Sequence, residues 1–289
     1  MRWTPGGDSE DLEDRRAEGG GGGGFNIGGF GAPHIGIGGL LLLGVLSFVF
    51  KIDLISPFLG TSGGSAPTHA VSNPVNDQAE EPQVKFVSFV LDDTQKTWEQ
   101  IMAQSGKQYR HAKLVLFRDE TNSGCGDAQA ASGPFYCPDD EKVYLDLAFF
   151  DELSQRFGAP GDFARAYVIA HELGHHVQKL LGIEGQVQRL QSAHPDQQNP
   201  LSVRLELQAD CFAGVWGYSA AQRGIVEKGD AEAALMAASA VGDDHLQKLA
   251  GRRVSPETFT HGSSEQRMMW FNQGFTSGKL GACNTFGGQ

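Results

Sequence analysis

The segment Ala166–Leu180, which reads AYVIAHELGHHVQKL, constrains the fold more than any other part of the sequence. Its apolar residues recur at helical spacing and no proline interrupts them, so we expect a buried helix. His171 and His175 then share one face, where both imidazoles can bind a single Zn²⁺, and Glu172 lies beside them. This HExxH pattern also arises by chance, as a cluster of satisfied polar groups. A buried helix has no structural need for these side chains, so a metal site is favoured.

A catalytic zinc ion needs a third protein ligand and an open position for water. The metzincin pattern HExxHxxGxxH is absent, because the chain has Gln178 and Gly182 at its glycine and third histidine positions. A second helical stretch, 203–217, carries Glu206 and Asp210 on one face among apolar neighbours. Glu206 can complete a His₂Glu site, and Asp210 can fix the tautomer of a ligand histidine. Two solvated surface acids are the alternative, which the apolar neighbours disfavour.

The composition limits the possible partners. The 289 residues carry a formal net charge of -12 without a dense run of Lys or Arg, which argues against a nucleic-acid partner. The 40% of apolar residues suffices for a sizeable core. No CxxC pair occurs, so a zinc ribbon or thioredoxin-like chemistry is poorly supported. The four cysteines, an even number, are expected to form two disulfides, and buried free thiols are the alternative. They are Cys125, Cys137, Cys211 and Cys283.

The N-terminal part has the composition of appendages. Residues 1–34 are acidic and then Gly-rich, which predicts a disordered tail. Residues 35–55 are predicted to form a transmembrane helix, although the uncharged run is short and needs Lys51 to snorkel. A cleaved signal peptide is the alternative. Residues 56–82 are rich in Ser, Gly, Pro and acids, which predicts a flexible linker.

The charges around the predicted anchor indicate its orientation. Arg2, Arg15 and Arg16 precede it, and Lys51 alone follows it closely. The positive-inside rule therefore predicts a single-pass protein of the cytoplasmic membrane with residues 1–34 in the cytoplasm. The C-terminal part would lie outside, in a periplasmic or extracellular compartment where disulfides persist.

Residues 83–289 are predicted to form one α+β domain. Strands are expected at 84–91, 112–117 and 143–147, a helix is expected at 94–105, and the second half is mainly helical. We therefore expect a small mixed sheet packed on a helical half, with the metal site between two antiparallel helices.

Several separated motifs give this domain a family resemblance. They are GPFYCP from Gly133, VIAHELGHHVQ from Val168, ELQADCFAGVW from Glu206, VGDD from Val241 and THGSSEQR from Thr260. In this order they resemble the bacterial family called putative neutral zinc metallopeptidases, and the two metal-site helices are similar to those of gluzincins. The resemblance implies a zinc peptidase with one Zn²⁺ per chain, a polypeptide substrate and Glu172 as general base.

The motif THGSSEQR is similar to the Thr-His-Pro-to-Arg element of membrane-bound gluzincins. This resemblance implies that His261 stabilises the oxyanion and that Arg267 supports the site. Gly262 stands where those proteins have proline. A capping box from Ser263 or Ser264 to Gln266 explains part of the motif equally well.

Two further clusters have structural interpretations. His176 points to a different helix face from His175 and is expected to be structural. Asp243 and Asp244, next to His245, are expected to cap a helix rather than bind a cation.

The cysteines and one strand complete the expected domain. A disulfide between Cys125 and Cys137 would close a short loop, and Cys211 would then pair with Cys283, although sequence alone does not fix the connectivity. By resemblance to gluzincins, the strand at 143–147 is expected to be an edge strand that pairs with extended substrate.

The leading functional hypothesis is an endopeptidase acting on extended polypeptide outside the cytoplasm. One alternative is a zinc-binding assembly module without turnover, and another is a zinc hydrolase of a non-peptide amide. Glu172 favours an enzyme, because zinc binding does not require it.

Overall fold

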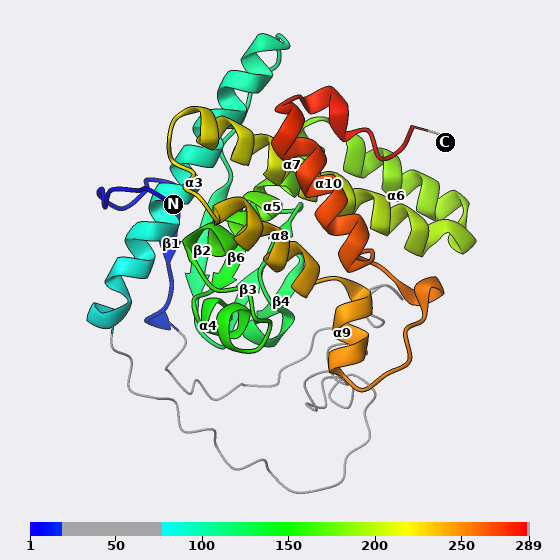
Figure 1. Cartoon of the computed structure of the whole chain (residues 1–289), viewed down its shortest axis with the longest axis horizontal. Coiled ribbons are helices and arrows are strands. Elements are labelled where there is room, and N and C mark those ends of the chain that lie inside the picture. The colour runs from blue at the N-terminus through cyan, green and yellow to red at the C-terminus, as the bar shows by residue number, and fades with distance from the viewer. Residues whose placement is uncertain (19–76, 288–289) are drawn as a thin grey trace, which may run out of the picture.

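The computed structural model describes residues 1–18 and 77–287, and within these ranges a small mixed sheet packs against helices (Figure 1). The sheet has the strand order β1-β2-β6-β5. β1 pairs with β2 and β2 with β6 in parallel, whereas β5 pairs with β6 in antiparallel orientation. A separate antiparallel pair is formed by β3 and β4. The strands are β1 Leu12–Asp14, β2 Lys113–Phe117, β3 Glu120–Ser123, β4 Gly126–Gln129, β5 Phe135–Cys137 and β6 Lys142–Asp146.

The second half of the chain is mainly helical, as predicted, and the fold is α+β. Helix α5 lies at its centre, packed against α3, α7 and α8, and its buried side chains join those of the sheet in one core. The α-helices are α3 Asp77–Gln104, α4 Ala148–Gln155, α5 Asp162–Leu180, α6 Ile183–Ala193, α7 Gln198–Gln222, α8 Asp230–Ala240, α9 Asp243–Leu249 and α10 Ser264–Ser277. Short 3₁₀ helices are η2 Ala130–Ser132, η3 Pro195–Gln197, η4 Pro256–Thr258 and η5 Leu280–Cys283.

The predicted strand at 84–91 and helix at 94–105 are in fact one helix, α3. Val84, Val87 and Leu91 are buried at helical spacing, as are Phe86 and Val90. A helix that buries a wide stripe against both the sheet and α5 produces an almost continuous apolar run, which resembles a buried strand. The predicted linker boundary after residue 82 is also wrong, because the helix begins at Asp77.

The predicted disordered tail is wrong for residues 1–18. This segment contributes β1, and Ser9 and Arg16 are buried within it, with exposed fractions of 7% and 6%. Composition misled the prediction because acidic side chains here are paired with basic ones on the sheet rather than solvated.

The rest of the predicted tail, the predicted transmembrane helix 35–55 and residues 56–76 of the predicted linker lie outside the described residues. In the ranges 1–18 and 77–287, no helix has the length and apolarity needed to cross a membrane.

The strands predicted at 112–117 and 143–147 are confirmed as β2 and β6 within one residue at each end. The predicted edge position of the second is wrong, because β6 lies between β2 and β5. Within the described part of the chain, the sheet edges are β1 and β5. The loop of β3 and β4 that precedes β5 could not be assigned from periodicity, since its strands are short and exposed.

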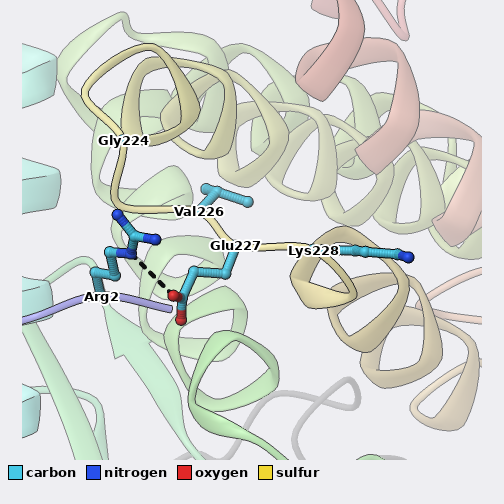
Figure 2. A pocket seen from close by; sticks show the side chains of 5 residues that line it. All are labelled: Arg2, Gly224, Val226, Glu227 and Lys228. Atoms are coloured by element: carbon cyan, nitrogen blue, oxygen red, sulfur yellow. Dashed lines mark hydrogen bonds and ion pairs between the residues drawn. The ribbon is translucent and has the colours of Figure 1, made fainter.

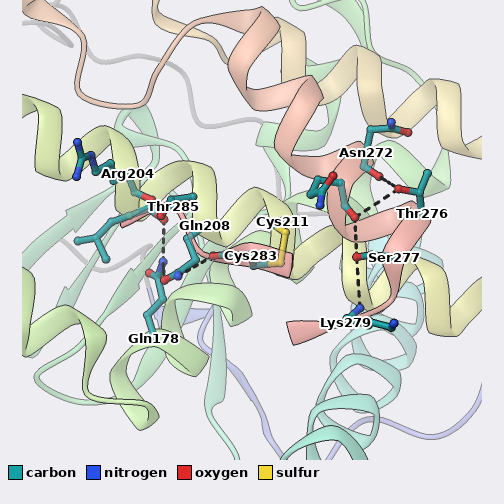
Figure 3. The surroundings of a disulfide bond; sticks show 12 residues. Gln178, Arg204, Gln208, Cys211, Asn272, Thr276, Ser277, Lys279, Cys283 and Thr285 are labelled. Carbon is teal, nitrogen blue, oxygen red and sulfur yellow. Dashed lines mark hydrogen bonds between the residues drawn. A yellow bond between two sulfur atoms is a disulfide. The ribbon is translucent and has the colours of Figure 1, made fainter. Parts of the chain in front are cut away.

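Both expected disulfides are present. Cys125–Cys137 joins the turn between β3 and β4 to β5. Cys211–Cys283 joins α7 to η5 near the C-terminal end of the described chain (Figure 3). The second bond closes a separation of 72 residues and fixes the C-terminal segment against the helix that carries Glu206.

Helices α7 and α10 approach so closely that a glycine is needed where their backbones meet. A Cβ built on Gly274 of α10 would lie 1.9 Å from the carbonyl oxygen of Cys211 and 2.8 Å from the amide nitrogen of Val215. The obstructing atoms belong to the α7 backbone, so they cannot rotate away. Glycine is therefore required for this distance between the two helices.

We expect Gly274→Ala to lower the free energy of unfolding by about 3 kcal/mol, because α7 and α10 must separate to admit the methyl group. Chemical denaturation of the full chain measures this loss. Gly281→Ala is the matched control, since a Cβ there meets no atom within 4 Å, and it should change stability by less than about 0.5 kcal/mol. Equal stability of the two variants would contradict the close approach.

Candidate metal centre

Helix α5 places the residues of the HExxH motif as the sequence predicts. His171 and His175 lie one turn apart with ring centroids separated by 4.9 Å. His171 and Glu172 are buried, with exposed fractions of 6% and 8%, while the His175 side chain is 20% exposed. The helix is buried on almost all sides, so these polar groups occupy its one partly open region.

Helix α7 brings Glu206 to the two histidines. Its Oε2 lies 3.2 Å from Nε2 of His171, and its Oε1 lies 3.5 Å from Nε2 of His175. One donor atom from each residue can be chosen so that all three lie within 4.8 Å of one another. The three residues could therefore hold one metal ion.

The two helices run antiparallel, as predicted. Near the start of α5, Tyr167 contacts Asp210, and near its end, Gln178 contacts the carbonyl of Leu205. A later residue of α5 thus contacts an earlier residue of α7. This arrangement places the middle of each helix, where the candidate ligands lie, opposite the middle of the other.

The Asp210 carboxylate binds Nδ1 of His171, the ring nitrogen that does not face Glu206. Oδ1 accepts hydrogen bonds from Nδ1 of His171 at 2.9 Å and from the Tyr167 hydroxyl at 2.5 Å. Arg267 of α10 donates from Nε to Oδ2 and from Nη2 to Oδ1, both at 2.9 Å. Burial favours the neutral acid, but Arg267 and His171 outweigh it and lower the pKa of Asp210. Asp210 is thus a buried anion that fixes the His171 tautomer with Nδ1 protonated.

A chain of amides orients His175. Its Nδ1 lies 2.9 Å from Oε1 of Gln178, whose Nε2 donates to the carbonyl of Leu205 at 2.7 Å and to Oε1 of Gln208 at 3.1 Å. Because Nε2 of Gln178 has two acceptors, Oε1 must face the imidazole, and Nδ1 of His175 must carry the proton. Gln208 donates in turn to the carbonyl of Cys283 at 2.9 Å (Figure 3).

The donor set fits a divalent cation such as Zn²⁺. Both histidines use Nδ1–H for a protein acceptor, so Nε2, which faces the Glu206 carboxylate in each ring, is the nitrogen available to a metal ion. Burial opposes charge on Glu206, but His175 and His171 outweigh it and lower the pKa of the carboxyl. Two imidazoles and an ionised carboxylate with oriented outer partners are typical ligands of zinc.

Protons compete with a metal ion for this site. Burial alone would lower the pKa of His171, but Asp210 and Glu206 together raise it to about 10. A protonated imidazole cannot bind a cation, so metal binding must release this proton.

Glu172 has the environment of a proton acceptor rather than of a fixed anion. Burial raises the pKa of its carboxyl above the ordinary value, against the opposing effect of His171 and His175. A carboxylate with a raised pKa is a stronger base near neutral pH. It does not belong to the group of three candidate ligands.

His261 lies in a loop that Asp243 holds in place. The backbone amides of Thr260, His261 and Gly262 donate to Oδ2 of Asp243 at 2.8, 2.7 and 3.0 Å. Nδ1 of His261 lies 3.2 Å from Oδ1 of the same carboxylate. Burial disfavours the charged ring, but Asp243 and Glu206 outweigh it and raise the pKa of His261.

Gly262 has a φ of 95°, which proline cannot adopt, so its departure from the gluzincin pattern belongs to a different loop shape. The expected helix cap is present for Asp244, which accepts a hydrogen bond at 2.7 Å from the backbone amide of Ser264, the first residue of α10. Asp243 caps no helix, since α9 has no side-chain cap and the Asp243 carboxylate binds the loop instead. The capping box of Ser263 and Gln266 is present at the start of α10. That box places Arg267 one residue later, pointing into the site.

The sequence identified the ligand candidates, but two residues that position them and one that positions His261 were not predicted to do so. Tyr167 precedes His171 by one helical turn, and Gln178 follows His175 by nearly one turn, so both could have been found by extending the polar face. Asp243 gave no such signal, because the loop that it holds begins at Thr260. His176 is structural, as expected: it contacts the Tyr136 hydroxyl and the carbonyl of Arg110.

Two imidazoles and a carboxylate thus form a group that could hold a metal ion, with a buried glutamate beside it. The family model described as "Putative neutral zinc metallopeptidase" matches residues 1–286, and the chain belongs to this family. The match includes the N-terminal segment, which the motifs quoted above do not.

Relatives come from distant bacteria. "Uncharacterized protein YpfJ" of Escherichia coli K12 is 49% identical over 294 residues, covering 99% of this chain and 99% of the relative. "Uncharacterized protein Rv2575" of Mycobacterium tuberculosis H37Rv is 44% identical over 190 residues, covering 62% of this chain and 63% of the relative. No solved structure matches this chain.

We expect Tyr167→Phe to weaken zinc binding about 10- to 100-fold, because Asp210 loses a donor and no longer holds His171 as firmly. Competition with a chelator measures the affinity. Tyr144→Phe is the matched control, since the Tyr144 hydroxyl donates to Asp140, in the turn between β5 and β6, and not to the candidate site. Unchanged affinity in Tyr167→Phe would show that the hydroxyl does not position the ligand.

Proposed function

We propose that this protein is a zinc-dependent endopeptidase of the gluzincin type. The observation that carries the proposal is the convergence of His171, His175 and Glu206 with Glu172 beside them but outside the ligand group. A site that only stored or bound zinc would not need a buried glutamate with a raised pKa at that position.

The chemistry divides between the cofactor and the protein. Bound zinc supplies a Lewis acid that acidifies water and polarises a carbonyl. Glu172 accepts the proton of the attacking water and delivers it to the amine that leaves. His171, His175 and Glu206 hold the cofactor, and Asp210 and Gln178 keep both imidazoles in the tautomer that this requires.

His261 is proposed as the group that stabilises the oxyanion. Its raised pKa favours a ring with two N–H groups, of which Nδ1–H faces Asp243 and Nε2–H remains for another acceptor. The His261 side chain is 36% exposed, so a substrate can reach it. Asp243 therefore orients the ring and supports its charge.

We propose that β5, rather than β6, binds the substrate backbone. β6 is paired on both sides, whereas β5 is paired with β6 alone in the described part of the chain. The Tyr136 hydroxyl of β5 lies 2.9 Å from Nδ1 of His176, the neighbour of His175, which ties this edge to the metal-site helix. An extended polypeptide adding to β5 would gain main-chain hydrogen bonds without a requirement for sequence.

We propose that the domain works in an oxidising compartment outside the cytoplasm. All four cysteines of the chain form disulfides, and such bonds rarely persist in a reducing cytosol.

We expect Glu172→Gln in the full chain to keep one zinc per chain while proteolysis of denatured casein falls about 10²- to 10⁴-fold, because the proton acceptor is lost. Glu206→Gln should lose the zinc itself. Metal analysis and a peptide-release assay measure the two effects. If wild type binds zinc but cuts no polypeptide, the hypothesis of an assembly module or of a hydrolase of a non-peptide amide replaces this one. If wild type binds no zinc, the proposed metal site is wrong.

We expect His261→Ala to keep zinc and to lower kcat about 10²- to 10³-fold, because a hydrogen-bond donor to the oxyanion is removed. Steady-state kinetics on a fluorogenic peptide provide the measurement. His194→Ala is the control, since His194 is exposed at the end of α6. A change confined to KM in His261→Ala would assign the residue to substrate binding instead.

A further inference from the structure

The N-terminal segment 1–18 forms part of the sheet that supports the metal centre. β1 pairs in parallel with β2 from Leu12↔Leu114 to Asp14↔Leu116. Backbone hydrogen bonds extend the contact on both sides, from the Leu114 amide to the Asp11 carbonyl and from the Arg15 amide to the Leu116 carbonyl, both at 2.8 Å. Without this segment, β2 would expose an unpaired edge.

The same segment is fixed to the helices by an aromatic anchor. The Trp3 ring packs edge-on against Phe86 of α3 with centroids 5.4 Å apart. Its Nε1 donates to Oδ2 of Asp162, the first residue of α5, at 3.0 Å. Next to it, Arg2 forms an ion pair with Glu227 at 2.9 Å in the surface pocket where the segment meets the loop before α8 (Figure 2).

Charge complementarity continues along the segment. Asp11 pairs with Lys113 at 2.8 Å, and Glu13 pairs with Lys142 at 2.8 Å, so two acidic residues face two basic residues of β2 and β6. Arg16 is buried and pairs with Glu80 of α3 at 2.8 Å. Single exposed ion pairs contribute little, but here several act together with strand pairing and a half-buried aromatic ring.

We propose that residues 1–18 are a structural part of the metal-centre domain and occupy the same cellular compartment as it does. Strand pairing and buried contacts require both partners on one side of any membrane. One crossing between residues 18 and 77 would place them on opposite sides in every copy, so a neighbouring copy could not supply β1 either. The proposal does not depend on zinc or on peptidase activity.

This proposal differs from the orientation expected from the positive-inside rule. That rule placed residues 1–34 in the cytoplasm because of three arginines, yet Arg2, Arg15 and Arg16 are all engaged in ion pairs within the domain. Because these arginines pair with acidic residues in the folded chain, their positive charge is not evidence for membrane orientation. The family match over residues 1–286 agrees with a domain that includes this segment.

Single-cysteine labelling tests the shared compartment. The four native cysteines are paired, so only an added thiol reacts with a membrane-impermeant maleimide. Asp8→Cys reports on the segment and Lys248→Cys on the domain, and the side chains that they replace are 59% and 65% exposed. In spheroplasts that express the full chain, we expect both thiols to react to the same extent, either before lysis or only after it. Reaction of one before lysis and of the other only afterwards would overturn the proposal.

A second variant tests whether the segment is docked in the folded chain. Ser9→Cys changes the residue next to Asp8, but Ser9 is only 7% exposed and hydrogen-bonds to Asp92 of α3. After lysis, we expect the thiol at position 9 to react at least about tenfold more slowly than the thiol at position 8, since it must wait for local opening. Equal rates would show that the segment is not docked, and the inference would fail even if the metal centre is active.

Discussion

The arrangement of the metal centre depends on the ionised carboxylate of Asp210. It lies in α7, accepts hydrogen bonds from Tyr167 and His171 of α5, and is neutralised by Arg267 of α10. A buried charge is stable only when it is paired and hydrogen-bonded, so the three helices must keep their relative positions for this anion to exist. The same contacts fix the tautomer of His171. The stability of the helical half and the preparation of a metal ligand therefore have a common origin.

The candidate ligand group could be predicted because helical periodicity places its members. His171 and His175 share a face in an α-helix, and Glu206 with Asp210 repeats that spacing on a second helix. Residues that act across loops could not be found this way. Asp243 and His261 are brought together by the backbone path of 260–262, whose φ angles are not encoded in any periodic pattern. The family resemblance included both Asp243, in the motif VGDD, and His261, but it did not show that the carboxylate holds the histidine.

The fold was predictable where a short apolar run is a whole element and ambiguous where such a run is part of a longer helix. β2 and β6 were found within one residue, whereas α3 was divided into a strand and a helix because its residues 84–91 form an almost continuous apolar run. The segment 1–18 was misjudged for a different reason. Composition describes how a segment behaves in water, and it cannot reveal a partner such as Lys142, which lies more than a hundred residues further along the chain.

The sheet has a consequence for the order in which the domain folds. Contacts of the N-terminal segment span 102 residues from Asp11 to Lys113, 129 from Glu13 to Lys142 and 159 from Trp3 to Asp162. Closing such long loops costs entropy before any contact compensates for it, and domains of high contact order fold slowly. During synthesis, β1 must wait unpaired until β2 and β6 have emerged. β1 is thus made before the strand that it pairs with and is among the last elements to join the sheet.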